Sequence, residues 1–170
     1  MAIDVSSTEA GEDLLTATFC LENDLLFGIN AILIQEMVMV GEITPVRHAP
    51  DFVAGIRNLR GRIITVIDLS VRLGIGSVEI GPETRILIAD WKGEPVGLLV
   101  DRVCDAIALE PGDLEPAPSN LNGVQAQKML GVFRCGERLA ALLDPSAVLG
   151  HDDQPADALP VRTGKRASFA

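Results

Sequence analysis

Short apolar runs alternate with Gly, Asn, Asp and Pro breaks about every ten residues between residues 13 and 150. This spacing is typical of an all-β barrel or sandwich, in which short strands are joined by tight turns. Within residues 16–22, Ala17, Phe19 and Leu21 can share one face of a strand because side chains alternate along it. Asn23-Asp24 then predicts a turn into a second strand over residues 25–29.

Three further hairpins follow the same rule. One joins residues 84–89 to residues 96–100 through Lys92-Gly93, and two others turn at Arg60-Gly61 and Cys135-Gly136. Helical signals are short. The best helix candidate runs from Ala31 to Met37, with Asn30 as its N-cap.

The chain contains an internal repeat at a fixed offset of 76 residues. Residues 55–74 align with residues 131–150, and six of the twenty positions are identical. The identical pairs are Gly55/Gly131, Arg62/Arg138, Asp68/Asp144, Ser70/Ser146, Leu73/Leu149 and Gly74/Gly150. Coincidence between similar hairpins is the alternative explanation, but the shared capping residues and glycines favour a true repeat.

Both copies read as strand, turn, strand and one helical turn. Asp68 and Asp144 are predicted to cap that helical turn, with Pro145 at its first position. Gly74 and Gly150 are predicted to end it with a positive φ. The repeat therefore predicts that the two halves of the chain are two copies of one small barrel, with a crevice where the barrels meet.

The ends of the chain differ in composition from the middle. Residues 1–12 are small, polar and acidic, and we expect a flexible arm. Residues 151–170 combine Asp, Pro, Ala and basic residues without periodicity, and we expect a flexible tail. The folded domain is predicted to span residues 13–150.

Charge and composition exclude several classes of partner. The net charge of -10 opposes binding to nucleic acid phosphates and to anionic lipids. The longest apolar stretch, residues 25–34, contains Asn30 and is too short for a bilayer span, so no direct membrane insertion is expected. No signal peptide is recognisable at the N-terminus. Three cysteines without a CxxC spacing indicate buried thiols in a reducing compartment, so a cytoplasmic location is predicted.

Signatures of catalysis are missing from the sequence. His48 and His151 are the two histidines, which leaves almost no material for a histidine-based triad or a two-histidine metal site. No Walker A, nucleophile elbow or HExxH motif is present. Aspartates such as Asp51 and Asp105 could pair as acid and base, although turn and capping roles explain most of them. We expect no enzyme, no cofactor and no metal.

Two features favour a binding role. The first is a basic cluster in an otherwise acidic chain, made up of Arg57, Arg60 and Arg62. A solvated hairpin tip is the simple explanation, but Arg60 directly precedes a turn glycine and should point outward.

The second is the dense apolar run over residues 32–40. It is either simple core or, in part, an exposed patch for a partner helix, with Ile34, Met37 and Met39 as candidates.

Residues 50–69 closely resemble the signature of CheW-type chemotaxis coupling proteins, an apolar run followed by N-L-R-G and a strand ending in D-L. Phe27-Gly28-Ile29 and Ile34-Gln35-Glu36 resemble the preceding segment of that family, and residues 97–103 and 116–118 its later half. The resemblance covers roughly residues 13 to 150, in order and without large gaps. N-L-R-G alone is a weak signal, whereas the ordered set is specific.

This resemblance implies a fold and a function. The fold is two small, intertwined, five-stranded β-barrel subdomains that share a core. The function is a non-catalytic adaptor that couples the cytoplasmic tip of a methyl-accepting chemoreceptor to the regulatory domain of a CheA-type histidine kinase, without a cofactor. The receptor-binding positions that it implies are Ile34, Glu36, Gly55, Asn58, Arg60 and Val103, with a buried or half-buried Glu36–Arg60 bridge beside the groove.

The sequence departs from the family pattern around Pro116-Ala117-Pro118. Many members carry Arg before this motif and an aromatic residue after it, near a kinase or array contact, where this chain has Glu115 and Asn120. Both are candidate contact residues, and the family's usual Tyr before Gly28 is Phe27. A second hypothesis, a double barrel that binds a small apolar ligand in its crevice, stays open, although no motif gathers several polar groups.

Overall fold

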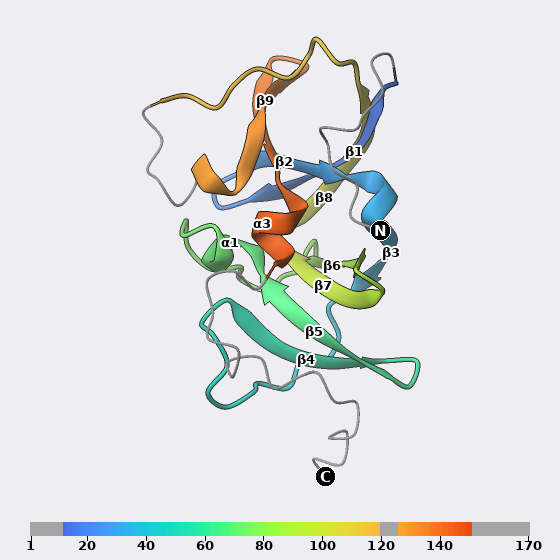
Figure 1. The fold of residues 1–170 in the computed structure, drawn as a ribbon. Coiled ribbons are helices and arrows are strands. Elements are labelled where there is room, and N and C mark those ends of the chain that lie inside the picture. The colour runs from blue at the N-terminus through green and yellow to red at the C-terminus, as the bar shows by residue number, and fades with distance from the viewer. Residues whose placement is uncertain (1–11, 120–125, 151–170) are drawn as a thin grey trace.

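The computed structural model describes residues 12–119 and 126–150, and this part of the chain is built mainly of strands (Figure 1). The strands are β1 (Leu14–Leu21), β2 (Leu25–Asn30), β3 (Ile34–Met39), β4 (Val53–Leu59), β5 (Arg62–Asp68), β6 (Arg85–Trp91), β7 (Glu94–Val100), β8 (Arg102–Leu109), β9 (Met129–Cys135) and β10 (Arg138–Leu143). The helices are the 3-10 turn η2 (Ala31–Leu33), α1 (Leu69–Arg72) and α3 (Pro145–Leu149). The predicted all-β class with a few short helices is confirmed, and so are the four hairpins.

The strands form two five-stranded sheets, with orders β8-β1-β2-β10-β9 and β3-β6-β7-β5-β4. Figure 1 shows the first sheet above the second, with α1 and α3 between them. In each sheet an isolated bridge ties the segment after one outer strand to the opposite outer strand. These bridges are Thr44 to Ile56 and Glu115 to Val132, so each sheet curls back toward its own far edge.

The internal repeat is real, but the two halves exchange hairpins. The first half builds β3, β4 and β5 into one sheet and contributes its β1–β2 hairpin to the other. The second half builds β8, β9 and β10 and contributes β6–β7 in return. Parallel pairing of β10 with β2 and of β5 with β7 joins the halves within each sheet. The expectation of one barrel per half is therefore wrong, because each sheet contains strands from both halves.

The exchange places one core between the sheets and one within each sheet. Alternate residues of the central strands point to opposite sides, so both faces are buried. On β6, Leu87 and Ala89 face the shared core, while Ile86 and Ile88 face the interior of their own sheet. On β1, Phe19 enters the shared core and Cys20 enters the other sheet's interior. Burial on both faces explains the nearly continuous apolar runs of the sequence.

Both predicted caps and one of the two predicted glycine ends are confirmed, and the other glycine end is wrong. Asp68 accepts a hydrogen bond from the Val71 amide at 3.2 Å, and Asp144 accepts one from the Ser146 amide at 3.0 Å. Gly74 has the expected positive φ of 71°, but Gly150 has a φ of -71°.

The helix predicted over residues 31–37 is the second error. Asn30 does accept from the Ile32 amide at 3.0 Å, but the helical turn ends at Leu33 and β3 begins at Ile34. Residues 34–39 alternate between half-buried and exposed positions, and this period of two suits pairing with β6. The available strand partner overrides the local helical preference.

None of the helices within the described residues is long and apolar enough to cross a membrane. The predicted arm (residues 1–12) lies outside the described residues except for Glu12, which is exposed, and the predicted tail (residues 151–170) lies wholly outside them.

Candidate functional site

An exposed ion pair joins the two outer strands of the second sheet. The Arg60 guanidinium donates from both Nη atoms to the two carboxylate oxygens of Glu36, each at 2.8 Å. Arg60 lies in the β4–β5 turn and Glu36 on β3, at opposite ends of the strand order. Their side chains are 70% and 32% exposed, so the pair lies at the surface and remains open to a partner. The expected buried or half-buried bridge is therefore half-buried at Glu36 but exposed at Arg60.

Each side chain of this ion pair stabilises the charged form of the other. Hydrogen bonding from Arg60 lowers the pKa of Glu36, and hydrogen bonding to Glu36 raises the pKa of Arg60. Both groups are therefore charged at neutral pH. Two parallel N–H···O bonds also fix the orientation of the guanidinium, which a single contact would not do. The arrangement presents a fixed, planar cation beside β3.

The N-L-R-G motif has a local structural explanation. Arg60 and Gly61 both have positive φ, 51° and 84°, as a two-residue hairpin turn of this hand requires. Asn58 accepts a hydrogen bond from the Gly61 amide at 2.9 Å and closes the turn. Asn58 is itself exposed, so it holds the turn that positions Arg60 and can also be reached by a partner.

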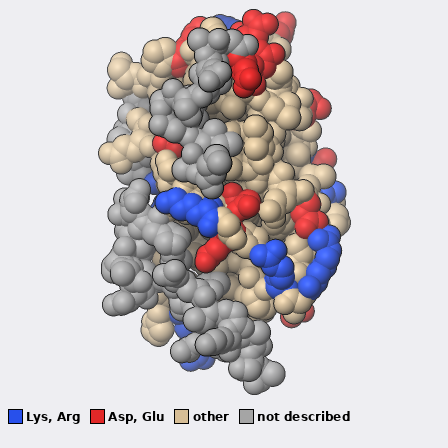
Figure 2. Space-filling view, turned by 45° about the vertical axis from the view of Figure 1, so that its right-hand side comes forward, with Lys and Arg blue, Asp and Glu red and all other residues tan. Residues whose placement is uncertain are grey.

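Apolar side chains extend this surface along β3. Met37 and Met39 are 53% and 61% exposed, and Arg57 donates from Nη1 to the carbonyl of Met39. In Figure 2, Lys and Arg side chains lie next to carboxylates over the lower half of the molecule, which holds β4 and β5 in Figure 1. Of the three candidates for an exposed patch, Met37 and Met39 are exposed, whereas Ile34 is half-buried.

The remaining predicted contact residues lie deeper. Ile34 and Val103 are half-buried and pack against the shared core from β3 and β8. Gly55 is buried, with a φ of 151°, and an added Cβ would lie 2.3 Å from the Thr44 carbonyl oxygen. Thr44 exchanges two 2.8 Å backbone hydrogen bonds with Ile56. The absence of a side chain at Gly55 permits this bridge between the ends of the sheet.

We expect Gly55→Ala to lower the free energy of unfolding by more than about 1 kcal/mol, because the backbone is strained for any side chain there and the methyl group would displace Thr44. Urea unfolding measures this change. Gly112→Ala is the control, since a Cβ there meets nothing within 4 Å. Equal stability of the two variants would contradict this role for Gly55.

Of the two candidate kinase contacts, one lies within the described residues. Glu115 is exposed, and its backbone exchanges 2.8 Å hydrogen bonds with Val132 of β9. Asn120 lies outside the described residues. Both remain predictions.

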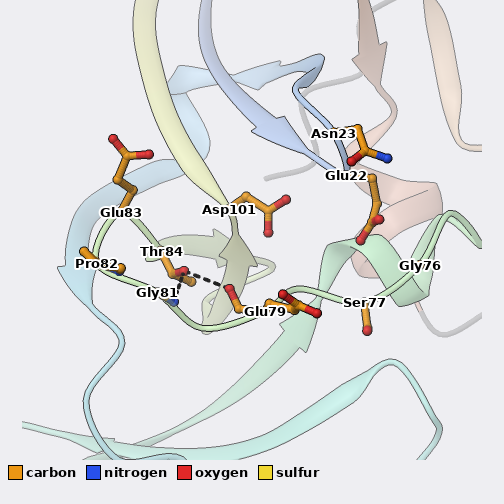
Figure 3. Close-up of a pocket in the computed structure, with 10 residues that line it drawn as sticks. All are labelled: Glu22, Asn23, Gly76, Ser77, Glu79, Gly81, Pro82, Glu83, Thr84 and Asp101. Carbon is orange, nitrogen blue, oxygen red and sulfur yellow. Dashed lines mark hydrogen bonds between the residues drawn. The ribbon is translucent and has the colours of Figure 1, made fainter.

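A cavity of about 590 Å³ lies away from this surface, between the β1–β2 turn and the loop from α1 to β6. Figure 3 shows Glu22, Glu79 and Asp101 turned toward one another, while Thr84 ties the loop by bonding the Gly81 amide and the Glu79 carbonyl. Sequence reasoning missed this cavity, because its residues come from separate segments. Its carboxylates do not suit an apolar ligand in this cavity.

Asp101→Asn is expected to stabilise the fold near neutral pH. Burial, with added repulsion from Glu22, Asp68 and Glu79, raises the pKa of Asp101. The folded state thus holds the Asp101 proton more tightly than the unfolded state, and this carboxyl group lowers stability as pH rises above its ordinary value of 3.8.

Urea unfolding at about pH 7 and about pH 3 tests the sign, since the gain should disappear once the carboxyl is protonated in both states. Glu94→Gln, at an exposed position on β7, is the control. A gain of the same size at both pH values would show that charge is not its cause.

Metal ligands do not gather in the part of the chain that the structure describes: no three His, Cys, Asp or Glu side chains there are arranged to hold an ion.

The chain is similar to known proteins of one family. The model of the CheW-like domain matches residues 16–153. Chemotaxis protein CheW of Rhizobium meliloti is 30% identical over 149 residues, covering 88% of this chain and 94% of the relative. Protein FrzA of Myxococcus xanthus is 29% identical over 126 residues, covering 73% and 78%. The crystal structure of scaffolding protein TtCheW from Thermoanaerobacter tengcongensis has a TM-score of 0.69 at 30% identity, covering 78% and 84%. The chain thus belongs to the CheW-like family.

Proposed function

We propose that this protein is a non-catalytic adaptor that couples a methyl-accepting chemoreceptor to a CheA-type histidine kinase in chemotaxis or a related chemosensory pathway. The observation that carries the proposal is the exposed Arg60–Glu36 pair, at the edge of a domain that matches the CheW-like family over residues 16–153. Relatives are named as chemotaxis proteins, and the solved structure is that of a scaffolding protein. The adaptor acts in the cytoplasm, without a cofactor or a nucleic acid partner.

The receptor site combines three kinds of contribution. Arg60 and Glu36 present a fixed guanidinium, which suits a carboxylate on the receptor tip. Asn58 and Gly55 hold the turn and the sheet edge in shape. Ile34 and Val103 are the partly accessible apolar residues against which a receptor helix packs. The set is the receptor-binding site of the proposal.

The methionines beside this site widen it. Met37 and Met39 are exposed on β3, and flexible thioether side chains adapt to the surface of a partner helix. The regulatory domain of the kinase is the second partner, and Glu115 and Asn120 are proposed to contact it or the surrounding array.

Binding of two purified partners tests the proposal. The full chain should bind a cytoplasmic fragment of a chemoreceptor and, separately, the regulatory domain of the kinase, as measured by titration calorimetry. When all three are mixed, a ternary complex should elute as one species in size-exclusion chromatography. Absence of binding to both partners, by protein shown to be folded by circular dichroism, would refute the adaptor function.

A further inference from the structure

Two cysteines far apart in the sequence meet within one sheet. Cys20 on β1 and Cys104 on β8 are 84 residues apart, and their Sγ atoms are 3.3 Å apart. In the ladder between these strands, Cys20 is opposite Arg102, and the register shifts between Ala17 and Phe19. This irregularity lies beside Cys104. The two sulfurs are therefore in direct contact.

The distance between the sulfurs leaves little movement for a covalent bond. An S–S bond is about 2.05 Å long, so the atoms must approach by little more than about 1 Å. Cys20 is 2% exposed and fixed in a core cluster, whereas Cys104 is half-buried on an outer strand. Among the described residues, strand β8 is at the edge of its sheet and pairs with β1, so a small shift of Cys104 does not disturb a second ladder there.

Two guanidinium groups lie beside the Cys20 sulfur. Arg102 Nη2 lies 3.3 Å and Arg138 Nη2 4.0 Å from it. Asp24 pairs with both arginines, at 2.5 Å and 3.7 Å. Burial, together with the hydrogen bond to Cys20, raises the pKa of Cys104 to about 11, so Cys104 keeps its proton at neutral pH and can donate toward Cys20.

We propose that Cys20 and Cys104 are a modification site that forms a reversible intramolecular disulfide on reaction with a peroxide. One of the two sulfurs, as a thiolate, attacks one peroxide oxygen, the O–O bond breaks, and the leaving hydroxide takes the former thiol proton to become water. The other sulfur then attacks this sulfenic sulfur. The S–O bond breaks, and the hydroxyl group leaves as a second water with the proton of the second thiol. Two thiols and one hydrogen peroxide thus give one disulfide and two waters.

Disulfides in the cytosol are usually transient and redox-sensing, which suits a pair that lies preassembled as thiols. Cys135 provides an internal control. It lies on β9, at the opposite end of the strand order from β8. Cys135 is also half-buried and packs against the cluster that contains Cys20, so its general surroundings are similar.

The experiment exposes the full chain to hydrogen peroxide and then to an alkylating reagent. Intact mass spectrometry should show the loss of two hydrogen atoms and alkylation of one of the three cysteines, and peptide mapping should identify a Cys20–Cys104 link. Dithiothreitol should restore all three alkylatable thiols. Cys135→Ser should still form the link, whereas Cys104→Ser should not.

A disulfide that involves Cys135, or stepwise oxygen addition without a cross-link in the wild type, would overturn the inference. The same loss of hydrogen in Cys104→Ser would also overturn it. The inference does not rest on the proposed adaptor function, because no partner is present in the assay.

Discussion

Arg60→Glu is expected to weaken binding to a receptor cytoplasmic fragment by at least about tenfold, because arginines at the centre of an interface are common binding hot spots. The substitution breaks both 2.8 Å hydrogen bonds to Glu36 and places two carboxylates side by side on the proposed site. Like charges there oppose an acidic partner. Titration calorimetry measures the loss, and circular dichroism should show an unchanged fold, since the side chain is 70% exposed.

Arg134→Glu is the matched control. It makes the same charge reversal at an exposed position on β9, in the other sheet, and should leave receptor affinity within about twofold. Wild-type affinity for Arg60→Glu would show that the site is placed wrongly.

The exchanged pair Arg60→Glu with Glu36→Arg separates two roles of the bridge. If the bridge acts by joining β3 to the β4–β5 turn, the exchanged pair should recover most of the lost affinity. If the guanidinium at position 60 contacts the receptor directly, affinity should stay low even though the two outer strands are joined again. The change in binding free energy of the double variant, minus the sum of the changes for Arg60→Glu alone and Glu36→Arg alone, gives the coupling energy between the two residues.

Phe19→Ala is expected to lower the free energy of unfolding by about 3–5 kcal/mol, the usual cost of removing a buried aromatic side chain. Phe19 is fully buried, and its ring stacks on that of Phe27 with the centroids 6.2 Å apart. The cluster that contains it draws on both sheets and includes residues of α1 and α3. Urea unfolding should show one transition, because neither sheet can bury its inner face without the other.

Phe133→Ala is the comparison, since Phe133 is equally buried but belongs to the cluster within one sheet. Both variants should unfold in one step at lower urea concentration. Two separate transitions in either variant would contradict a single cooperative unit. A decrease of less than about 1 kcal/mol in the free energy of unfolding of Phe19→Ala would also contradict the prediction.

Local chemistry made much of this molecule predictable from its residues. The Arg60-Gly61 and Lys92-Gly93 turns, and the caps at Asp68 and Asp144, depend on residues within a few positions of one another, and all are present. The ordered family signature indicated an adaptor. It also pointed to the Arg60–Glu36 pair, although nothing in residues 36–60 alone requires the two side chains to meet.

Contacts between distant segments were decided by the fold. Residues 34–39 could form a helix or a strand until β6 offered a pairing partner, and pairing set the outcome. Three other features also bring together segments that are far apart in the sequence. They are the exchange of hairpins, the acidic cavity at Asp101 and the contact between Cys20 and Cys104. Turns and caps are short-range interactions that a sequence displays directly. Strand order arises from burying all the apolar faces at once, and only the assembled structure satisfies that condition.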